Sequence, residues 1–203
     1  PIEKNAGYDK QNNSYDVSPF IRDYLSIKQK KITGMKDIYT EFKAYAEKMP
    51  GEMESIMKDL LGYAKRYNKL LLGHPSFPAK LKASLFRLNR FESSVTRPFL
   101  MEVMRLQESS LLTLDEVAEI CRIVESYLLR RIICDLPSNT LAKVFLTMSS
   151  DIKRFDGTYS NFIEKMKYVL TSKKEKAAFP DNETFADCLR TKNIYAMLPR
   201  YKA

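Results

Sequence analysis

Residues that could perform acid–base or metal chemistry are scarce in this sequence. His74 is the only histidine, which excludes His-Glu-x-x-His zinc sites and other sites that need two histidines. Because it lies between Gly73 and Pro75, we expect it in a loop, where a histidine is more often a turn residue than a general base. The run Asp156 to Tyr159 is typical of a plain turn, and no Gly-x-x-x-x-Gly-Lys phosphate loop occurs. We therefore expect no catalytic, metal-binding or cofactor-binding residue here.

The adjacent arginines Arg130 and Arg131 could bind phosphate. Neighbouring residues on a helix point about 100° apart, so both cannot lie at the centre of the solvent-facing side, and one is expected to border the core. There its guanidinium would need a carboxylate or the carbonyls of a helix end as partners. We favour this structural role, and a phosphate contact is the alternative.

A second group of cations lies between residues 153 and 176, with Tyr159, Phe162 and Tyr168 among them. Basic and aromatic residues together can bind nucleic acid, although aromatic residues at helical spacing also pack in a core and leave the cations on the solvated side. The candidate DNA-contacting residues are Arg130, Arg131, Lys153, Arg154, Lys165, Lys167, Lys173, Lys174 and Lys176.

The composition agrees with a basic, folded protein. The chain has 203 residues, which suits one sizeable domain or two small ones. Its 34 Lys and Arg outnumber 25 Asp and Glu, so the net charge is +9. DNA or another polyanion is therefore a candidate partner, although basic proteins also use charge for solubility. No apolar run approaches the ~20 residues of a membrane span and no signal peptide is visible, so we expect no membrane partner.

The cysteines indicate the compartment. Cys121, Cys134 and Cys188 make an odd number, form no Cys-x-x-Cys and lie in apolar or amphipathic runs. Buried free thiols in a reducing cytoplasm explain this pattern best.

Apolar residues recur at helical spacing along most of the chain and predict an all-α bundle of about eight to ten antiparallel helices. Hydroxyl side chains are predicted to cap four of them: Ser18, Thr33, Thr113 and Ser138. Residues 1–16 are predicted to form a flexible arm, and 17–203 one helical domain of a longer protein. The predicted helices cover 18–27, 35–46, 50–67, 78–88, 98–107, 117–136, 141–148, 162–170, 179–189 and 194–198.

One long segment points to a family. The run Glu125 to Asn139, followed by Leu141, Lys143 and Phe145, resembles a recurring block of the GmrSD-type, modification-dependent (type IV) restriction endonucleases. Further similar segments occur in the family's order between residues 19 and 198. They are Ile21 to Leu25, Tyr39 to Tyr45, Arg97 to Leu100, and Phe179 to Asp181 with Phe185.

The resemblance implies a bacterial defence protein with a nucleotide-handling ParB-like N-terminal domain and a DNA-cutting HNH C-terminal domain. The present chain would be the helical region between them, and its parent a nucleotide-dependent endonuclease. It lacks the Asp-Gly-Gln-Gln-Arg type motif of the first domain, and one histidine cannot supply the HNH site, so no catalytic residue is carried over. Asp135 stands where glycine is expected and Ala142 where asparagine is frequent, which leaves the form of that turn open.

Two functions follow as hypotheses. In the first, the chain is a non-catalytic helical module that links sensor and nuclease domains and contacts DNA, with those domains of the same chain as partners. In the second, it is a helical protein-interaction scaffold with no nucleic-acid role. One continuous basic face would favour DNA, and scattered charge would favour the scaffold. The oligomeric state, the nucleotide and the DNA modification stay open.

Overall fold

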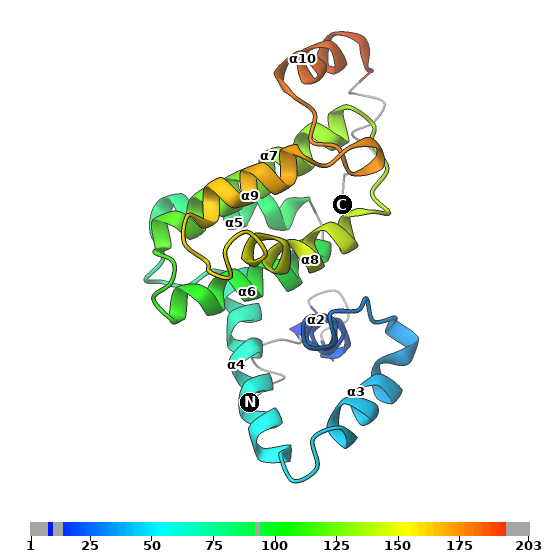
Figure 1. The fold of residues 1–203 in the computed structure, drawn as a ribbon, viewed down its shortest axis with the longest axis vertical. Coiled ribbons are helices and arrows are strands. Elements are labelled where there is room, and N and C mark those ends of the chain that lie inside the picture. Colours follow the sequence, from blue (N-terminus) through cyan, green and yellow to red (C-terminus); the bar gives the residue numbers. More distant parts are fainter. Residues whose placement is uncertain (1–7, 10–13, 92–93, 194–203) are drawn as a thin grey trace.

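The computed structural model describes residues 8–9, 14–91 and 94–193. The described residues form an all-α, multi-helix bundle, as the sequence predicts (Figure 1). Nine α-helices are present in these ranges, with three short 3₁₀ helices between them. The elements are α2 (Ser18–Gln29), η1 (Met35–Asp37), α3 (Ile38–Glu47), α4 (Met53–Leu72), α5 (Ala79–Arg90), η2 (Ser94–Thr96), α6 (Arg97–Glu108), α7 (Leu114–Ile133), α8 (Leu141–Lys153), α9 (Phe162–Thr171), η3 (Glu175–Ala177) and α10 (Asn182–Thr191).

Helix α6 lies at the centre of the bundle because it is apolar on almost every side. Its buried residues include Phe99, Met101, Val103 and Met104, which leave little polar face for solvent. A helix with this pattern must be covered all round. Helices α2, α4, α7 and α8 pack against it, while α3 with one end of α4 and α10 extend to opposite ends of the molecule (Figure 1).

Helix α7 begins as the sequence predicts. The side chain of Thr113 accepts a hydrogen bond from the backbone N–H of Glu116 at 3.2 Å, and the Glu116 carboxylate accepts one from the backbone N–H of Thr113 at 2.8 Å. This capping box satisfies two backbone donors that a helix start otherwise leaves unpaired.

The end of α7 differs from the prediction, because the helix stops at Ile133 rather than at residue 136. Asp135 adopts a left-handed conformation with φ of 56°. The backbone N–H of Leu136 then donates to the carbonyl of Arg131 at 2.9 Å, and that of Asp135 to Ile132 at 3.0 Å. These two bonds form a Schellman cap, so aspartate takes the place where the family resemblance implied glycine.

The other three predicted hydroxyl caps are wrong. Ser18 is the first residue of α2 and follows the N-cap residue Val17. Thr33 is buried, and its backbone N–H donates to the hydroxyl of Ser26. Ser138 contributes its backbone carbonyl, not its side chain, to the turn that precedes α8. Hydroxyl residues also stabilise turns, so their presence before a helix did not fix their role.

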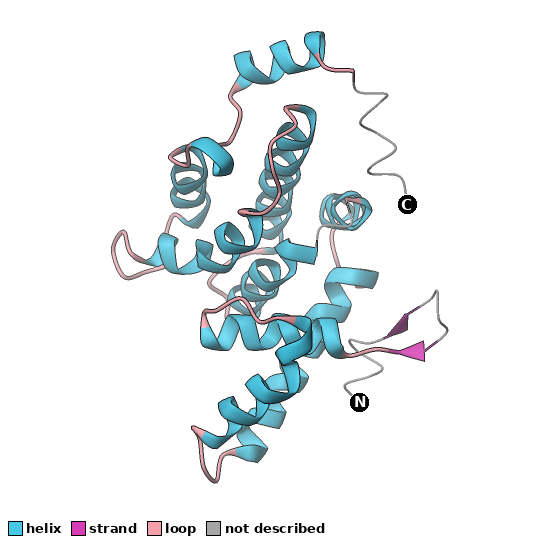
Figure 2. Ribbon diagram, turned by 90° about the vertical axis from the view of Figure 1, so that its right-hand side faces the viewer, coloured by secondary structure: helices cyan, strands magenta, loops and turns pink. Residues whose placement is uncertain are grey.

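The described part of the predicted arm contains a structure that the sequence did not suggest. Strands β1 (Tyr8–Asp9) and β2 (Ser14–Tyr15) pair antiparallel at the edge of the helical body (Figure 2). Because each strand has only two residues, the pair does not change the all-α fold class. The rest of residues 1–13 and the helix predicted at 194–198 lie outside the described residues.

Candidate anion-binding site

Arg131, one of the candidate DNA-contacting residues, is 2% exposed. Its Nη1 donates to the carbonyl of Ala178 at 2.8 Å, and its Nη2 to the carbonyls of Pro137 at 2.6 Å and Lys176 at 2.7 Å. Its guanidinium also lies over the ring of Tyr127, 5.2 Å from the centroid. The interpretation of Arg131 as a phosphate contact is therefore corrected: this arginine borders the core and binds backbone carbonyls.

The neighbouring Arg130 holds the chain a few residues further on. It donates to the carbonyl of Pro180 at 2.9 Å and to the side-chain oxygen of Asn182 at 2.6 Å. Its guanidinium also lies 5.0 Å from the ring centroid of Phe185. Arg130 thus attaches α10 to α7 and is only partly available to another ligand.

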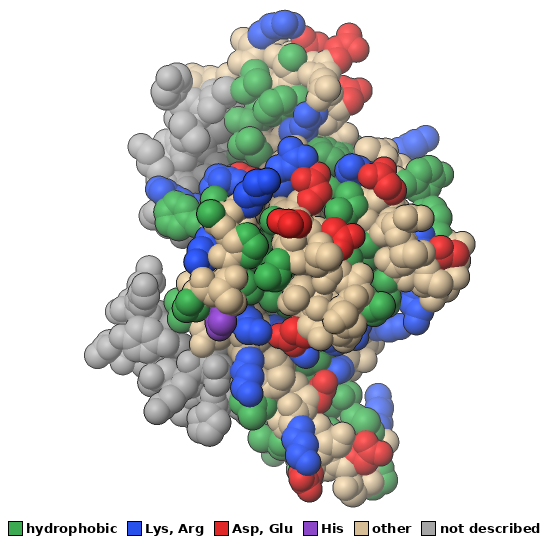
Figure 3. Space-filling view, turned by 90° about the vertical axis from the view of Figure 1, so that its left-hand side faces the viewer, with side chains coloured by type: hydrophobic (Ala, Val, Ile, Leu, Met, Phe, Trp, Pro, Cys, Tyr) green, Lys and Arg blue, Asp and Glu red, His purple; other side chains and the backbone are tan. Residues whose placement is uncertain are grey.

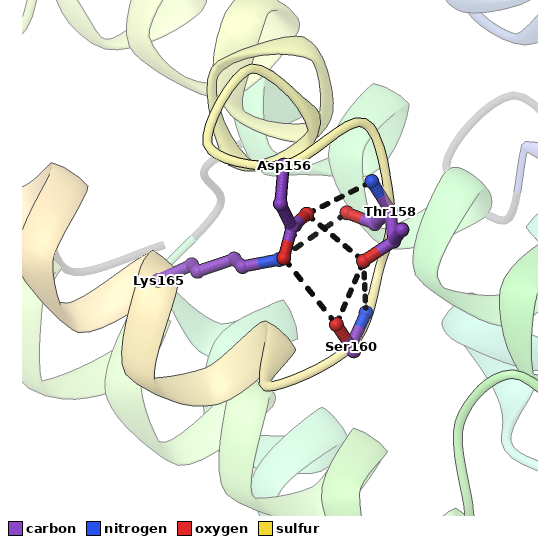
Figure 4. A network of polar contacts seen from close by, with 4 residues as sticks. All are labelled: Asp156, Thr158, Ser160 and Lys165. Atoms are coloured by element: carbon purple, nitrogen blue, oxygen red, sulfur yellow. Dashed lines mark hydrogen bonds and ion pairs between the residues drawn. The ribbon is translucent and has the colours of Figure 1, made fainter.

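Lys165 is a second candidate that the structure removes from the surface, because it is only 9% exposed. Its ammonium group donates to both carboxylate oxygens of Asp156 at 2.7 Å and lies 3.4 Å from the carbonyl of Thr158 (Figure 4). The Lys165 ammonium and hydrogen bonds from the backbone and side chain of Thr158 lower the pKa of Asp156 to about 2. The predicted turn at 156–159 is thus present, and Lys165 of α9 holds it in place through Asp156 and the carbonyl of Thr158.

Lys153, Arg154 and Lys173 come together where α8 and α9 end. Arg154 and Lys173 both pair with the carboxylate of Asp151, at 3.0 Å and 3.5 Å. Lys153 instead lies over the ring of Tyr159, 5.7 Å from its centroid. Of the remaining candidates, Lys167 pairs with Glu164, and Lys174 and Lys176 are exposed.

A cavity of about 420 Å³ opens between α2, α6, α8 and the loop that contains Tyr159. We call it the basic pocket. Lys30, which is the C-cap residue of α2, faces it together with Lys153 and Arg154 from the end of α8. Its other lining residues are Ile27, Pro98, Phe99, Glu102, Phe145, Leu146, Ser149, Ser150 and Tyr159.

Two of the charges in the basic pocket are neutralised by neighbours. Arg154 pairs with Asp151, and Glu102 accepts hydrogen bonds from Arg105 at 3.1 to 3.3 Å and from the hydroxyl of Tyr63. Lys30 and Lys153, in contrast, have no carboxylate partner among the residues that the structure describes. The pocket therefore carries the two unpaired charges of Lys30 and Lys153, while Arg154 shares the single carboxylate of Asp151 with Lys173.

The basic pocket also holds an unpartnered hydroxyl. The Oγ of Ser149 is buried and makes no hydrogen bond. An unsatisfied buried polar group costs about 1–3 kcal/mol. Ser149 is also one of the residues that line the pocket.

Sequence reasoning found Lys153 and Arg154 but missed Lys30 and Ser149. Lys30 follows the first long helix, and nothing in its local sequence distinguishes it from Lys28 or Lys31, both of which pair with carboxylates. Only the packing of α2 and α8 against α6 brings the two unpaired lysines to one cavity.

One face of the molecule mixes positive and negative side chains. On the face shown in Figure 3, Lys and Arg side chains are interspersed with Asp and Glu, so this face offers no continuous basic surface. By itself this face favours the protein-interaction scaffold, and the case for an anion rests on the cations of the basic pocket.

The cysteines differ partly from the prediction of buried thiols. Cys121 is buried, and burial raises the pKa of its thiol to about 12. Cys134 and Cys188 are only half-buried, at the contact between α7 and α10. Burial and a hydrogen bond with the Cys188 thiol raise the pKa of Cys134 to about 12. All three are free thiols.

No group of three or more His, Cys, Asp or Glu that could hold a metal occurs within residues 8–9, 14–91 and 94–193. None of the helices in those ranges is both long enough and apolar enough to cross a membrane. No protein-family model, curated protein or solved structure matches this chain.

Proposed function

We propose that this chain is a non-catalytic helical module that contacts nucleic-acid phosphates through the basic pocket. The observation that carries the proposal is the pair of unpaired lysines, Lys30 and Lys153, which α2 and α8 hold against one cavity. Positive groups that lack a protein counter-ion attract an anion from solution, and low-dielectric walls concentrate their field. Phosphate is the anion that nucleic acids present in greatest density.

The net charge of the whole chain supports the same partner. A charge of +9 draws a polyanion by long-range attraction, while the pocket provides a place for close contact. Arg154 lines the pocket and Lys173 lies beside it, and both pair with Asp151. They could bind further phosphates if that shared ion pair were broken.

The family resemblance gives this module a place in a longer protein. As the resemblance implies, it would lie between a ParB-like sensor domain and an HNH nuclease domain of one cytoplasmic endonuclease, and these domains would supply nucleotide handling and DNA cleavage.

The direct test is binding of the chain to duplex DNA, unmodified and base-modified, across a salt series. Each phosphate contact should contribute about −0.9 to the slope of log affinity against log salt. We expect measurable binding at low salt and a slope equivalent to several phosphates. Absence of binding at low salt would contradict the proposal.

A specific observation favours the alternative function, a protein-interaction scaffold. Leu72 and Phe86 are 73% and 63% exposed and line one groove of about 600 Å³ between the end of α4 and α5, beside His74. Exposed apolar side chains that share a groove are typical of protein contacts. Under this alternative, Phe86→Ala would abolish association with a partner domain and leave DNA binding unchanged.

A further inference from the structure

We infer that the basic pocket binds a terminal phosphate monoester, such as the phosphorylated end of a nucleic acid strand, more tightly than an internal phosphate of a duplex backbone. This inference rests on the proposed function, since it names the group that enters the same pocket. It follows from the shape of the site, its charge and its unpartnered hydroxyl.

The shape of the pocket favours a group at the end of a chain. The two lysines approach from different walls, Lys30 from the end of α2 and Lys153 from the end of α8, with Pro98 and Phe99 of α6 also lining the cavity. Lys30 and Lys153 are both exposed, so an internal phosphate of a duplex, which lies between two sugars, can meet their ammonium groups only at the mouth of the pocket. A terminal phosphate is attached through one oxygen only and can enter.

The charge of the pocket matches a monoester. Lys30 and Lys153 contribute two positive charges without a carboxylate partner among the described residues, and Arg154, which shares Asp151 with Lys173, adds part of a third. A phosphate monoester carries about −1.5 to −2 at pH 7, whereas each internal diester carries about −1. A diester would leave one lysine without a counter-charge.

The hydroxyl of Ser149 is a candidate hydrogen-bond donor to the bound phosphate. This oxygen is buried and makes no hydrogen bond within the protein. Turned toward the pocket, it would donate to one of the three free oxygens of a monoester, in a charge-assisted hydrogen bond. The aromatic ring of Tyr159, over which Lys153 lies, restrains that lysine on the same side.

Glu102 lines the pocket and would repel an anion if its charge were unopposed. Both of its carboxylate oxygens accept hydrogen bonds from Arg105, and one also accepts from Tyr63. Its negative charge is therefore compensated within the protein by Arg105.

The test compares oligonucleotides of one sequence that differ only at their ends. Anisotropy titrations would use strands with a 5′-phosphate, a 3′-phosphate or hydroxyls at both ends, and separate titrations would use inorganic phosphate and phenyl phosphate. We expect at least one phosphorylated end to bind about tenfold more tightly than the hydroxyl end, and phenyl phosphate to compete. Equal affinity for all three oligonucleotides would overturn the inference while leaving the proposed function intact.

The separate titrations with inorganic phosphate and phenyl phosphate distinguish failure of this inference from failure of the proposed function. Binding of phenyl phosphate without any binding of nucleic acid would support the pocket's ligand class and overturn the proposed function. Binding of inorganic phosphate alone, with no effect of phenyl phosphate, would show a site for the free ion and overturn the inference as stated.

Variants assign the effect to the pocket. Lys30→Gln and Lys153→Gln should each abolish the preference for the phosphorylated end, whereas Lys80→Gln, an exposed lysine of α5 outside the pocket, should preserve it. Ser149→Ala should weaken phosphate binding and raise the unfolding midpoint, because it removes an unsatisfied buried hydroxyl. An increase in stability with unchanged phosphate affinity would contradict the role of Ser149.

Discussion

The guanidinium of Arg131 donates a hydrogen bond from Nη1 to the carbonyl oxygen of Ala178, 2.8 Å away. Its Nη2 binds the carbonyl of Lys176, and the hydroxyl of Tyr127, one helical turn earlier on α7, donates to the carbonyl of Ala177 at 2.8 Å. Three successive carbonyls are thus held by two side chains of one helix. This contact fixes the segment that joins α9 to α10.

Replacement of Arg131 should destabilise the fold. Arg131→Met keeps much of the apolar stem but leaves three carbonyls without their charged donor, so we expect a loss of about 3 kcal/mol in the free energy of unfolding. Urea denaturation measures it. Arg130→Met, at a half-buried position with two hydrogen bonds, should cost about 1 kcal/mol. Equal losses for the two variants would contradict the account of Arg131.

Ser110→Gly should stabilise the protein. Ser110 follows α6 in a left-handed conformation with φ of 58°, which strains a residue with a β-carbon but not glycine. We expect a gain of about 0.5–1 kcal/mol, measured by thermal or urea unfolding. The matched control is Ser109→Gly, where φ is −88°, and it should be neutral or destabilising. Stabilisation by both variants would point to a different cause.

Asp23 should make the protein less stable as the pH rises from about 4 to 6. Burial raises the pKa of this carboxyl from 3.8 to about 6, against the lowering effects of Arg22 and Arg97. Between these two values the folded state binds a proton that the unfolded chain does not, so the free energy of unfolding falls as the pH rises.

Asp23→Asn removes this pH dependence. Relative to the wild type, the variant should become more stable by roughly 3 kcal/mol, as an upper value, between pH 4 and pH 7. Urea unfolding of both proteins at each pH measures the difference. A constant difference across this range would show that the Asp23 carboxyl does not titrate there.

The Asp156 carboxyl should make the protein less stable as the pH falls, which is the opposite pH dependence to that of Asp23. The Lys165 ammonium and hydrogen bonds from Thr158 lower its pKa to about 2, so its contribution to stability is present above the unfolded value near 4 and is lost as the pH falls through about 2. Titration of the carboxyl signal by NMR measures this directly. In Lys165→Met the pKa of Asp156 should rise toward its ordinary value, and an unchanged pKa would contradict the pairing shown in Figure 4.

The features that the sequence predicted correctly are local ones. Helical spacing identified the bundle, and the Thr113 capping box could be recognised because both partners lie within one turn. The placement of one of two adjacent arginines near the core followed from helix geometry alone. The hydrogen-bond partners of this arginine could not be predicted, because Lys176 and Ala178 reach Arg131 only when α9 folds back along α7.

The basic pocket was predictable only in part for the same reason. Lys153 and Arg154 belonged to a visible cluster of cations, but Lys165 in that cluster is buried against Asp156. Lys30 is far away in the sequence, and its lack of a carboxylate partner depends on where its neighbours Lys28 and Lys31 find theirs. Charge density along the chain therefore indicated a region and not the site.

The central claim is that Lys30 and Lys153 together contact nucleic-acid phosphate. The most direct test measures DNA binding across a salt series for the Lys30→Gln/Lys153→Gln double variant and for a Lys65→Gln/Lys80→Gln control, whose lysines are exposed on α4 and α5 outside the pocket. We predict that the pocket variant binds at least tenfold more weakly and that its salt slope is shallower by up to about 1.8, while the control resembles the wild type. Equal loss in both variants, or no loss in the pocket variant, would contradict the assignment of the basic pocket.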